Sequence, residues 1–138
     1  MAESVLARKM KMMARSRAAV INAPAGYLEE LAPLPAGVEI SEGLQGTLDW
    51  VQVFVRTSAE LRGVAPRLAR ALGAEGLLWI AFPKGTSGIQ TDLTRDKGWD
   101  ALADVDLKWV TLISVNDTWS AFALRPFRSG EARPKARR

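Results

Sequence analysis

The sequence predicts an α/β domain whose sheet is mostly parallel and is closed by a C-terminal antiparallel hairpin. The first observation is a set of short apolar runs, each followed by turn residues or a helical pattern, which is typical of strands buried on both faces. These runs are 18–24, 48–55 and 76–83. The second observation is a pair of β-rich runs, 107–115 and 118–124, around a short polar turn, which is typical of a hairpin.

The segment between the second and third apolar runs sets the direction of their strands. Thr57 followed three residues later by Glu60 is the pattern of a capping box, and apolar residues then recur at helical intervals up to Gly73. We expect a helix there, bent at Pro66. A strand, a helix and a second strand form a βαβ unit, in which the two strands run parallel.

Weaker patterns predict the remaining elements of the domain. Residues 27–32 fit a short helix before two prolines, and 38–40 fit a short strand. Residues 95–103 predict a further helix with Trp99 and Leu102 on one face.

The two ends of the chain differ from its middle. Residues 1–17 place four apolar side chains near helical spacing, which predicts an amphipathic helix that covers the core or packs against another subunit. A homodimer is therefore one of the open alternatives. Residues 127–138 are rich in Arg and Lys and predict a basic, disordered tail. The α/β domain itself is expected in 18–126.

The composition fits one globular domain. The chain has 138 residues, of which 48% are apolar and 25% charged, values typical of a folded protein with a single core. It has no Cys and no His, which excludes disulfides, thiolate chemistry and imidazole as acid, base or metal ligand. Catalysis would depend on Asp, Glu, Lys, Tyr27 or a cofactor, and no residue spacing indicates a metal site.

The net charge of +4 is unevenly distributed along the chain. Residues 1–17 hold five Lys or Arg and one acidic residue, and 125–138 hold six Lys or Arg and one acidic residue. Residues 18–124 hold eight Lys or Arg and thirteen acidic residues. An acidic body argues against a nucleic-acid groove on the domain, which leaves the basic tail as the contact for nucleic acid. No export signal and no apolar run of membrane-spanning length is present, so we expect a cytoplasmic protein without a membrane partner.

Ligands of open α/β sheets bind outside the carboxyl ends of the parallel strands. The residues that follow the predicted strands are therefore candidates for binding a small molecule or a protein: Asn22, Lys84, Thr86, Ser87, Asp92, Arg95, Asp117 and Trp119. The segment PKGTSG offers backbone amides, hydroxyls and an ammonium group, which suits an anion. It is not a P-loop, because its lysine precedes its glycines.

These candidates also have structural explanations. The segment PKGTSG can be an ordinary glycine-containing loop with a surface lysine. Asp92 and Asp96 lie where the next helix is expected to begin, a position that favours carboxylates through capping and the helix dipole. Asp92 with Asp96 or Asp117 could instead form an acid–base pair or hold a divalent ion through their oxygens. Trp119 either walls a pocket or packs in the core.

Four motifs resemble those of a family of short bacterial proteins of unknown function. They are a NAP-x-GY turn at 22–27, a W-I-x-(F/Y)-P-K strand end at 79–84, a D-L-x-R-D segment at 92–96 and a D-D-T-W-S-A hairpin at 116–121. Asn116 stands where the family has Asp. The resemblance covers about residues 18–126 and implies no particular activity.

The order of elements also resembles a reduced S-adenosylmethionine (SAM)-dependent methyltransferase, which implies a three-layer Rossmann-like domain. Those enzymes have a Gly-rich turn after the first strand, whereas this chain has APAGY, with Gly26 alone. The stretch 33–46 leaves little room for the usual strand, helix and acidic ribose ligand. We therefore expect a degenerate fold without a cofactor, and SAM or a nucleotide is disfavoured.

Three functions follow from this reading. The first is a methyltransferase-like domain that acts as a small-ligand or protein-interaction module without enzymatic activity. The second is an enzyme or nucleotide-binding protein that uses the polar residues at the strand ends. The third is a nucleic-acid accessory protein that binds through its basic termini.

Overall fold

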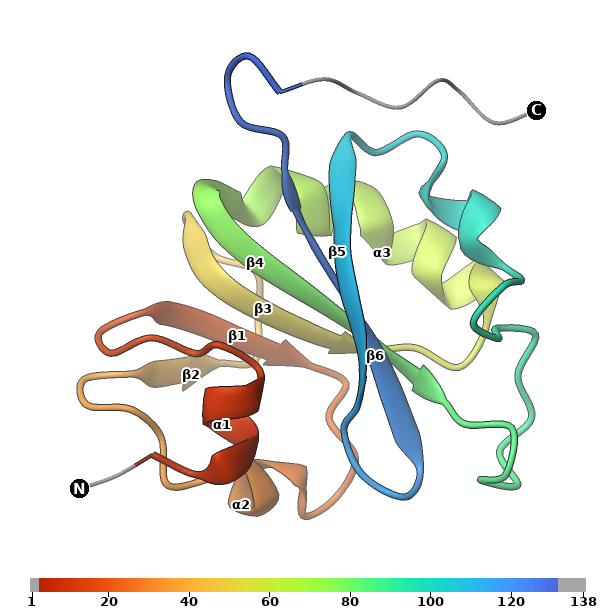
Figure 1. Cartoon of the computed structure of the whole chain (residues 1–138), viewed down its shortest axis with the longest axis horizontal. Coiled ribbons are helices and arrows are strands. Elements are labelled where there is room, and N and C mark those ends of the chain that lie inside the picture. Colours follow the sequence, from red (N-terminus) through yellow and green to blue (C-terminus); the bar gives the residue numbers. More distant parts are fainter. Residues whose placement is uncertain (1–2, 132–138) are drawn as a thin grey trace.

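One six-stranded sheet organises the computed structural model, which describes residues 3–131. The strands are β1 (Arg17–Ile21), β2 (Glu39–Ser41), β3 (Leu48–Phe54), β4 (Leu72–Pro83), β5 (Leu107–Ser114) and β6 (Trp119–Pro126). The helices are α1 (Val5–Lys9), α2 (Tyr27–Leu31), α3 (Ser58–Ala71) and the short 3-10 helix η1 (Trp99–Leu102). The strands lie in the order β2-β1-β3-β4-β6-β5 (Figure 1).

The sheet is mostly parallel, as the sequence predicts. Strand β1 pairs in parallel with β2 and β3, and β3 pairs in parallel with β4. Strand β6 is antiparallel to both β4 and β5, so the predicted hairpin closes the sheet. The three apolar runs therefore lie side by side and point the same way.

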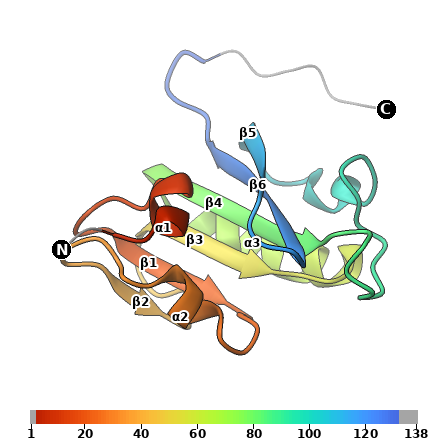
Figure 2. The ribbon, with the colours of Figure 1, turned by 60° about the horizontal axis from the view of Figure 1, so that its bottom comes forward.

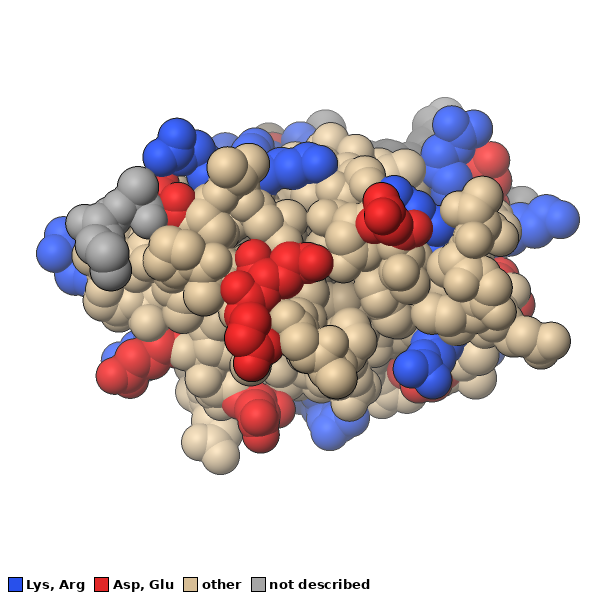
Figure 3. Space-filling view, turned by 90° about the horizontal axis from the view of Figure 1, so that it is seen from below, with Lys and Arg blue, Asp and Glu red and all other residues tan. Residues whose placement is uncertain are grey.

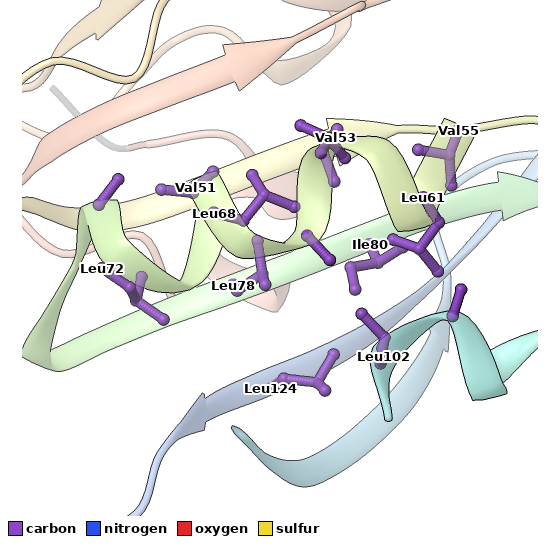
Figure 4. Close-up of a cluster of buried hydrophobic side chains, with 14 of the residues drawn as sticks. Val51, Val53, Val55, Leu61, Leu68, Leu72, Leu78, Ile80, Leu102 and Leu124 are labelled. Atoms are coloured by element: carbon purple, nitrogen blue, oxygen red, sulfur yellow. The ribbon is translucent and has the colours of Figure 1, made fainter. Parts of the chain in front are cut away.

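Helix α3 begins at the predicted capping residues and covers one face of the sheet. Thr57 Oγ1 accepts a hydrogen bond from the Glu60 backbone N at 3.1 Å, and Glu60 Oε1 accepts one from the Arg56 backbone N at 2.8 Å, which satisfies amides at the start of the helix. Figure 4 shows Leu61 and Leu68 pointing from α3 toward the sheet, where they join the first hydrophobic core. This packing forms the βαβ unit β3-α3-β4.

The N-terminal segment covers the opposite face, so the domain has three layers (Figure 2). The indole N–H groups of Trp50 and Trp79 both donate to the Met10 carbonyl oxygen, at 2.8 and 2.9 Å. Met10 and Met12 are buried in this second core with both tryptophans. The predicted N-terminal helix thus packs on its own sheet.

Two predicted helices are shorter in the structure. Within 1–17, α1 spans only Val5–Lys9, because Lys11 has a left-handed φ of 59° and the Met10 carbonyl bonds to the indoles. Within 95–103, only η1 forms, because Thr94 Oγ1 accepts from the backbone N of Lys97 and makes a turn instead. No helix in residues 3–131 is long and apolar enough to cross a bilayer.

A polar pair lies inside the second core. The Tyr27 hydroxyl donates to Gln52 Oε1 at 2.7 Å, and both residues are buried. Gln52 Nε2 has no hydrogen-bond partner in the described part of the chain. Burial raises the pKa of Tyr27, with the Gln52 hydrogen bond opposing the shift and the Glu30 charge adding to it.

The buried tyrosine predicts a loss of stability at alkaline pH. An unfolded tyrosine ionises near pH 10, whereas the folded protein keeps Tyr27 neutral to higher pH. Its contribution is present below about pH 10, and above that pH the free energy of unfolding falls by about 1.4 kcal/mol per pH unit more in the wild type than in Tyr27→Phe. Urea unfolding of both proteins at pH 9 to 11 tests this, and equal slopes would contradict it.

Candidate functional site

The carboxyl ends of the parallel strands meet at one edge of the sheet. Strand β1 is followed there by the turn 22–26, β3 by Arg56 and Thr57, and β4 by the loop 84–98. Strand β5 is antiparallel to β6 and so runs parallel to β4, which brings the turn 115–118 to the same edge. The structure thus confirms the predicted common edge.

The β5–β6 turn is attached to its neighbours at this edge. Lys84 donates from its backbone N to the Thr118 carbonyl at 2.8 Å and from Nζ to Ser114 Oγ at 2.6 Å. Asn116 Oδ1 accepts from the backbone N of Thr118 and Trp119, and its Nδ2 donates to Glu30 on α2 at 2.8 Å. Asn116 therefore shapes the turn, and an amide here makes a donor bond that a carboxylate could not make.

Asp92 fastens the loop 84–98 to the start of α3. Its Oδ1 accepts from the backbone N of Ser58 at 2.7 Å, and its Oδ2 accepts from the Ser58 hydroxyl at 2.5 Å. These hydrogen bonds lower the pKa of Asp92. The sequence predicted that Asp92 lies at the start of the helix that follows it. The structure instead places its carboxylate at the start of α3, where its partner Ser58 is 34 residues away in the sequence.

A hollow lies beside this loop at the carboxyl end of β4, and we call it the β4 hollow. Its volume is about 570 Å³. It is lined by Phe82, Pro83, Lys84, Gly85, Ile89, Gln90, Thr91, Leu93, Thr94, Arg95, Leu112 and Ser120. The lining holds two cations and no carboxylate. Of the predicted site residues, Lys84 and Arg95 therefore share one cavity.

The other predicted site residues lie elsewhere. Trp119 is only 4% exposed and packs edge-on against Phe54, with ring centroids 5.0 Å apart, so it belongs to the core and does not wall a pocket. Ser87 Oγ accepts from the Ile89 backbone N and shapes the loop, and Thr86 is exposed outside the hollow. Asp117 is exposed in the β5–β6 turn.

The edge formed by β1 and β2 offers an open turn and an acid. Asn22 and Gly26 have left-handed φ values of 60° and 83°, and no atom lies within 4 Å of where a Gly26 Cβ would stand. A ligand can therefore approach the backbone at this turn. Strand β2 is parallel to β1 and is followed directly by the exposed Glu42.

Glu42 corrects one sequence argument. The stretch 33–46 was expected to leave little room for the usual strand, helix and acidic ribose ligand; it contains no helix, but the short strand predicted at 38–40 forms as β2 and is followed by the acid Glu42. A strand of three residues is enough because it only needs to pair with β1. The signal was present in the sequence, since an acid follows the predicted strand 38–40 almost directly.

A groove starts at this acid and runs along α3. Its volume is about 420 Å³, and it is lined by Ile21, Glu42, Gly43, Leu44, Gly46, Val64, Arg67, Arg70 and Ala71. The connection between β2 and β3 has only six residues, 42–47, which are too few for a helix to cover this face. The α3 groove therefore stays open beside the β1 turn.

Comparison with solved structures identifies the fold. The chain is similar to a TehB-like SAM-dependent methyltransferase from Corynebacterium glutamicum, with a TM-score of 0.55 and 12% identity, covering 83% of this chain and 82% of that one. It is similar to DhpI in a complex with S-adenosylhomocysteine (SAH), with a TM-score of 0.60 and 10% identity over 86% and 79%. It is also similar to magnesium protoporphyrin IX methyltransferase from Synechocystis with bound SAM, with a TM-score of 0.55 and 11% identity, covering 88% of this chain and 74% of that one. No family model and no curated protein sequence matches the chain.

The fold is the Rossmann-like fold of SAM-dependent methyltransferases, as the element order implied. At 10–12% identity these matches establish the fold and no more. They correct the expectation of a domain without a cofactor, because two of these similar structures contain SAM or SAH. That expectation depended on the single glycine of the turn APAGY and on the little room in 33–46, yet a strand followed by an acid fits into this stretch.

Proposed function

We propose that this domain binds SAM or its product SAH at the carboxyl edge of β1 and β2, as a small-ligand module on the methyltransferase fold. The observation that carries the proposal is the position of Glu42 directly after β2, at the same edge of the sheet as the open turn that follows β1. Its carboxylate oxygens can accept hydrogen bonds from both ribose hydroxyls. The space at Gly26 lets the ligand contact the turn backbone.

Surface charge supports a positively charged ligand at this edge. SAM carries its methyl group on a positively charged sulfonium sulfur. The methyl group is what SAM supplies when it is bound. Figure 3 shows carboxylates in the middle of the side that carries α2 and the β5–β6 turn, with Lys and Arg toward its rim. Glu29 and Glu30 on α2 and Asp117 in the turn are exposed. Their field attracts a cation to the edge that the β1 turn and Glu42 share.

Removing the Glu42 carboxylate is expected to weaken SAH binding at least about tenfold, because hydrogen bonds to a charged group contribute about 1.5–3 kcal/mol. Isothermal titration calorimetry of Glu42→Ala with SAH measures the change. Glu39→Ala is the matched control, since Glu39 is an exposed acid at the other end of the same strand, and it should leave the affinity unchanged. A wild type that binds neither SAH nor SAM, or an unaffected Glu42→Ala, refutes the proposal.

A second candidate function is a contact with nucleic acid through the basic ends. Arg15 from the N-terminal segment and Arg128 from the C-terminal segment line one hollow of about 520 Å³, together with Lys11 and Arg125. This hollow borders the amino ends of β3 and β4, opposite the proposed SAH site. Asp49 and Glu75 also line it, and residues 132–138 of the basic tail lie outside the described chain.

Charge reversal at this hollow tests the nucleic-acid contact. In the double variant Arg15→Glu and Arg128→Glu, binding to single-stranded DNA should weaken, and the salt dependence of log K should fall by about 0.7 per lost contact. Fluorescence anisotropy at several salt concentrations measures both effects. The double variant Arg62→Glu and Arg67→Glu on α3 is the control, and an equal loss there would show that net charge alone is responsible.

A further inference from the structure

The β4 hollow combines positive charge with apolar side chains. Lys84 and Arg95 bring two positive charges to a cavity whose lining contains no Asp or Glu. We propose that the β4 hollow binds a small organic anion, a carboxylate or phosphate on an apolar and preferably aromatic body. This site is separate from the proposed SAH site, because none of its lining residues belongs to β1, β2 or their loops.

Both cations are free to bind a ligand. Lys84 Nζ forms no ion pair with a carboxylate of residues 3–131, and it donates one hydrogen bond, to the neutral Ser114 hydroxyl at 2.6 Å. Arg95 contacts Asp96 at 3.5 Å, but the two side chains are 73% and 76% exposed. Such an exposed pair contributes little, so an incoming anion can displace it.

Hydroxyl groups add neutral donors to this positive site. Thr91 Oγ1 accepts from the Leu93 backbone N at 3.0 Å, and Thr94 Oγ1 accepts from the Lys97 backbone N at 3.1 Å. Because each oxygen acts as acceptor in these bonds, each hydroxyl can still donate its proton to an anion. Ser120 and the Gln90 amide also line the hollow.

Apolar side chains also line the hollow, which is why we expect the ligand to have an apolar body. Phe82 lines the hollow and is held between Trp99 and Phe122, with ring centroids 5.1 and 5.7 Å away. Ile89 and Leu112 extend the wall. Side chains packed in this way form a fixed apolar surface, against which the apolar body of a ligand can pack at little entropic cost.

The loop that carries the site is held in place before a ligand arrives. Asp92 bonds twice to Ser58 on α3, and Trp99 Nε1 donates to the Thr94 carbonyl at 2.6 Å. A volume of about 570 Å³ lies within the range of small-molecule sites, about 300–1,000 Å³. A small anion therefore fits the hollow.

Titration calorimetry with four probes tests the inference on the full chain. Benzoate and phenyl phosphate should bind the wild type at least tenfold more tightly than benzamide, which has the same ring without the charge. Inorganic phosphate should bind more weakly than phenyl phosphate, because it lacks the ring. The stronger of benzoate and phenyl phosphate identifies the anion as carboxylate or phosphate.

Variants connect the binding to the hollow. Lys84→Gln and Arg95→Gln should each weaken benzoate or phenyl phosphate at least tenfold, whereas Lys97→Gln, an exposed lysine of the same loop outside the lining, should not. Leu112→Glu puts a carboxylate on the half-exposed wall and should abolish binding without loss of the fold. Circular dichroism checks that each variant is folded.

Specific outcomes would overturn the inference. Benzamide binding as tightly as benzoate, no binding of any probe by the wild type, or an equal loss in Lys97→Gln would each do so. Glu42→Ala separates this site from the proposed SAH site, since it should weaken SAH and leave the anionic probes unchanged. A chain that binds the anions but not SAH would reject the nucleoside proposal alone.

Discussion

Replacement of Trp79 by alanine is expected to lower the free energy of unfolding by about 3–5 kcal/mol. Trp79 is 0% exposed in the second core, where the surrounding β-sheet cannot collapse to fill the space of an indole. The substitution also removes the hydrogen bond from Nε1 to the Met10 carbonyl. Trp50 keeps its own bond to that carbonyl, so the N-terminal segment should stay attached but less firmly. Urea unfolding followed by circular dichroism measures the change.

Two further variants separate volume from hydrogen bonding at Trp79. Trp109→Ala is the matched control, because Trp109 lies on the edge strand β5 and is 43% exposed; it should lose less than half as much. Trp79→Phe keeps an aromatic ring and loses the N–H donor. Most of its destabilisation should therefore come from the lost hydrogen bond, which contributes about 0.5–1.5 kcal/mol. Equal losses for Trp79→Ala and Trp109→Ala would contradict the burial of Trp79 beneath the N-terminal segment.

Phe54→Ala is the second large expected effect, also about 3–5 kcal/mol. Phe54 ends β3, is 3% exposed and lies between the rings of Tyr27 and Trp119, at 4.7 and 5.0 Å between centroids. Its ring therefore connects the start of α2 to the β5–β6 hairpin beneath the carboxyl edge. Removing it leaves a cavity and also takes away two edge-to-face ring contacts.

The control for this position is a change of shape with most of the volume kept. Phe54→Leu should cost less than half as much as Phe54→Ala in urea unfolding, because a branched apolar side chain still fills the site. The emission of the buried Trp119 should shift to longer wavelength in Phe54→Ala more than in Phe54→Leu. Equal destabilisation by both would mean that the ring contacts, and not the filled volume, hold the hairpin in place.

The sequence predicted the features that depend on local pattern. The capping pair Thr57 and Glu60, the apolar runs and the polar turn near Asn116 all specify short-range structure, and each lies where it was expected. Their order implied the parallel sheet and the common edge, because a strand, a helix and a strand rarely connect in any other way. The mostly parallel sheet and its closing hairpin were therefore predictable from the residues alone.

The parts that could not be predicted depend on contacts between distant residues. Trp119 follows a polar turn and was a pocket candidate, but Phe54 from another strand covers it. Asp92 bonds to Ser58, 34 residues away, and not to the helix that follows it. Met10 ends α1 because two indoles from β3 and β4 bind its carbonyl, and no pattern in residues 1–17 contains that information.

The candidate site was predicted in part for the same reason. Lys84 and Arg95 belong to one loop, so their position after the third strand was enough to place them at one edge. Glu42 was missed although the strand before it was predicted, because the pairing partner of that strand could not be read from the sequence. Since β2 pairs in parallel with β1, Glu42 lies at the same edge of the sheet as the β1 turn.

Amide chemical shifts in a titration with SAH report directly on binding at the carboxyl edge of β1 and β2. The largest shifts are expected on the turn 22–27 and on Glu42 and Gly43, and they should vanish in Glu42→Ala but persist in Glu39→Ala. Shifts that spread over the β4 hollow and leave the β1 turn unchanged, or no shift at saturating SAH, would contradict SAH binding at this edge.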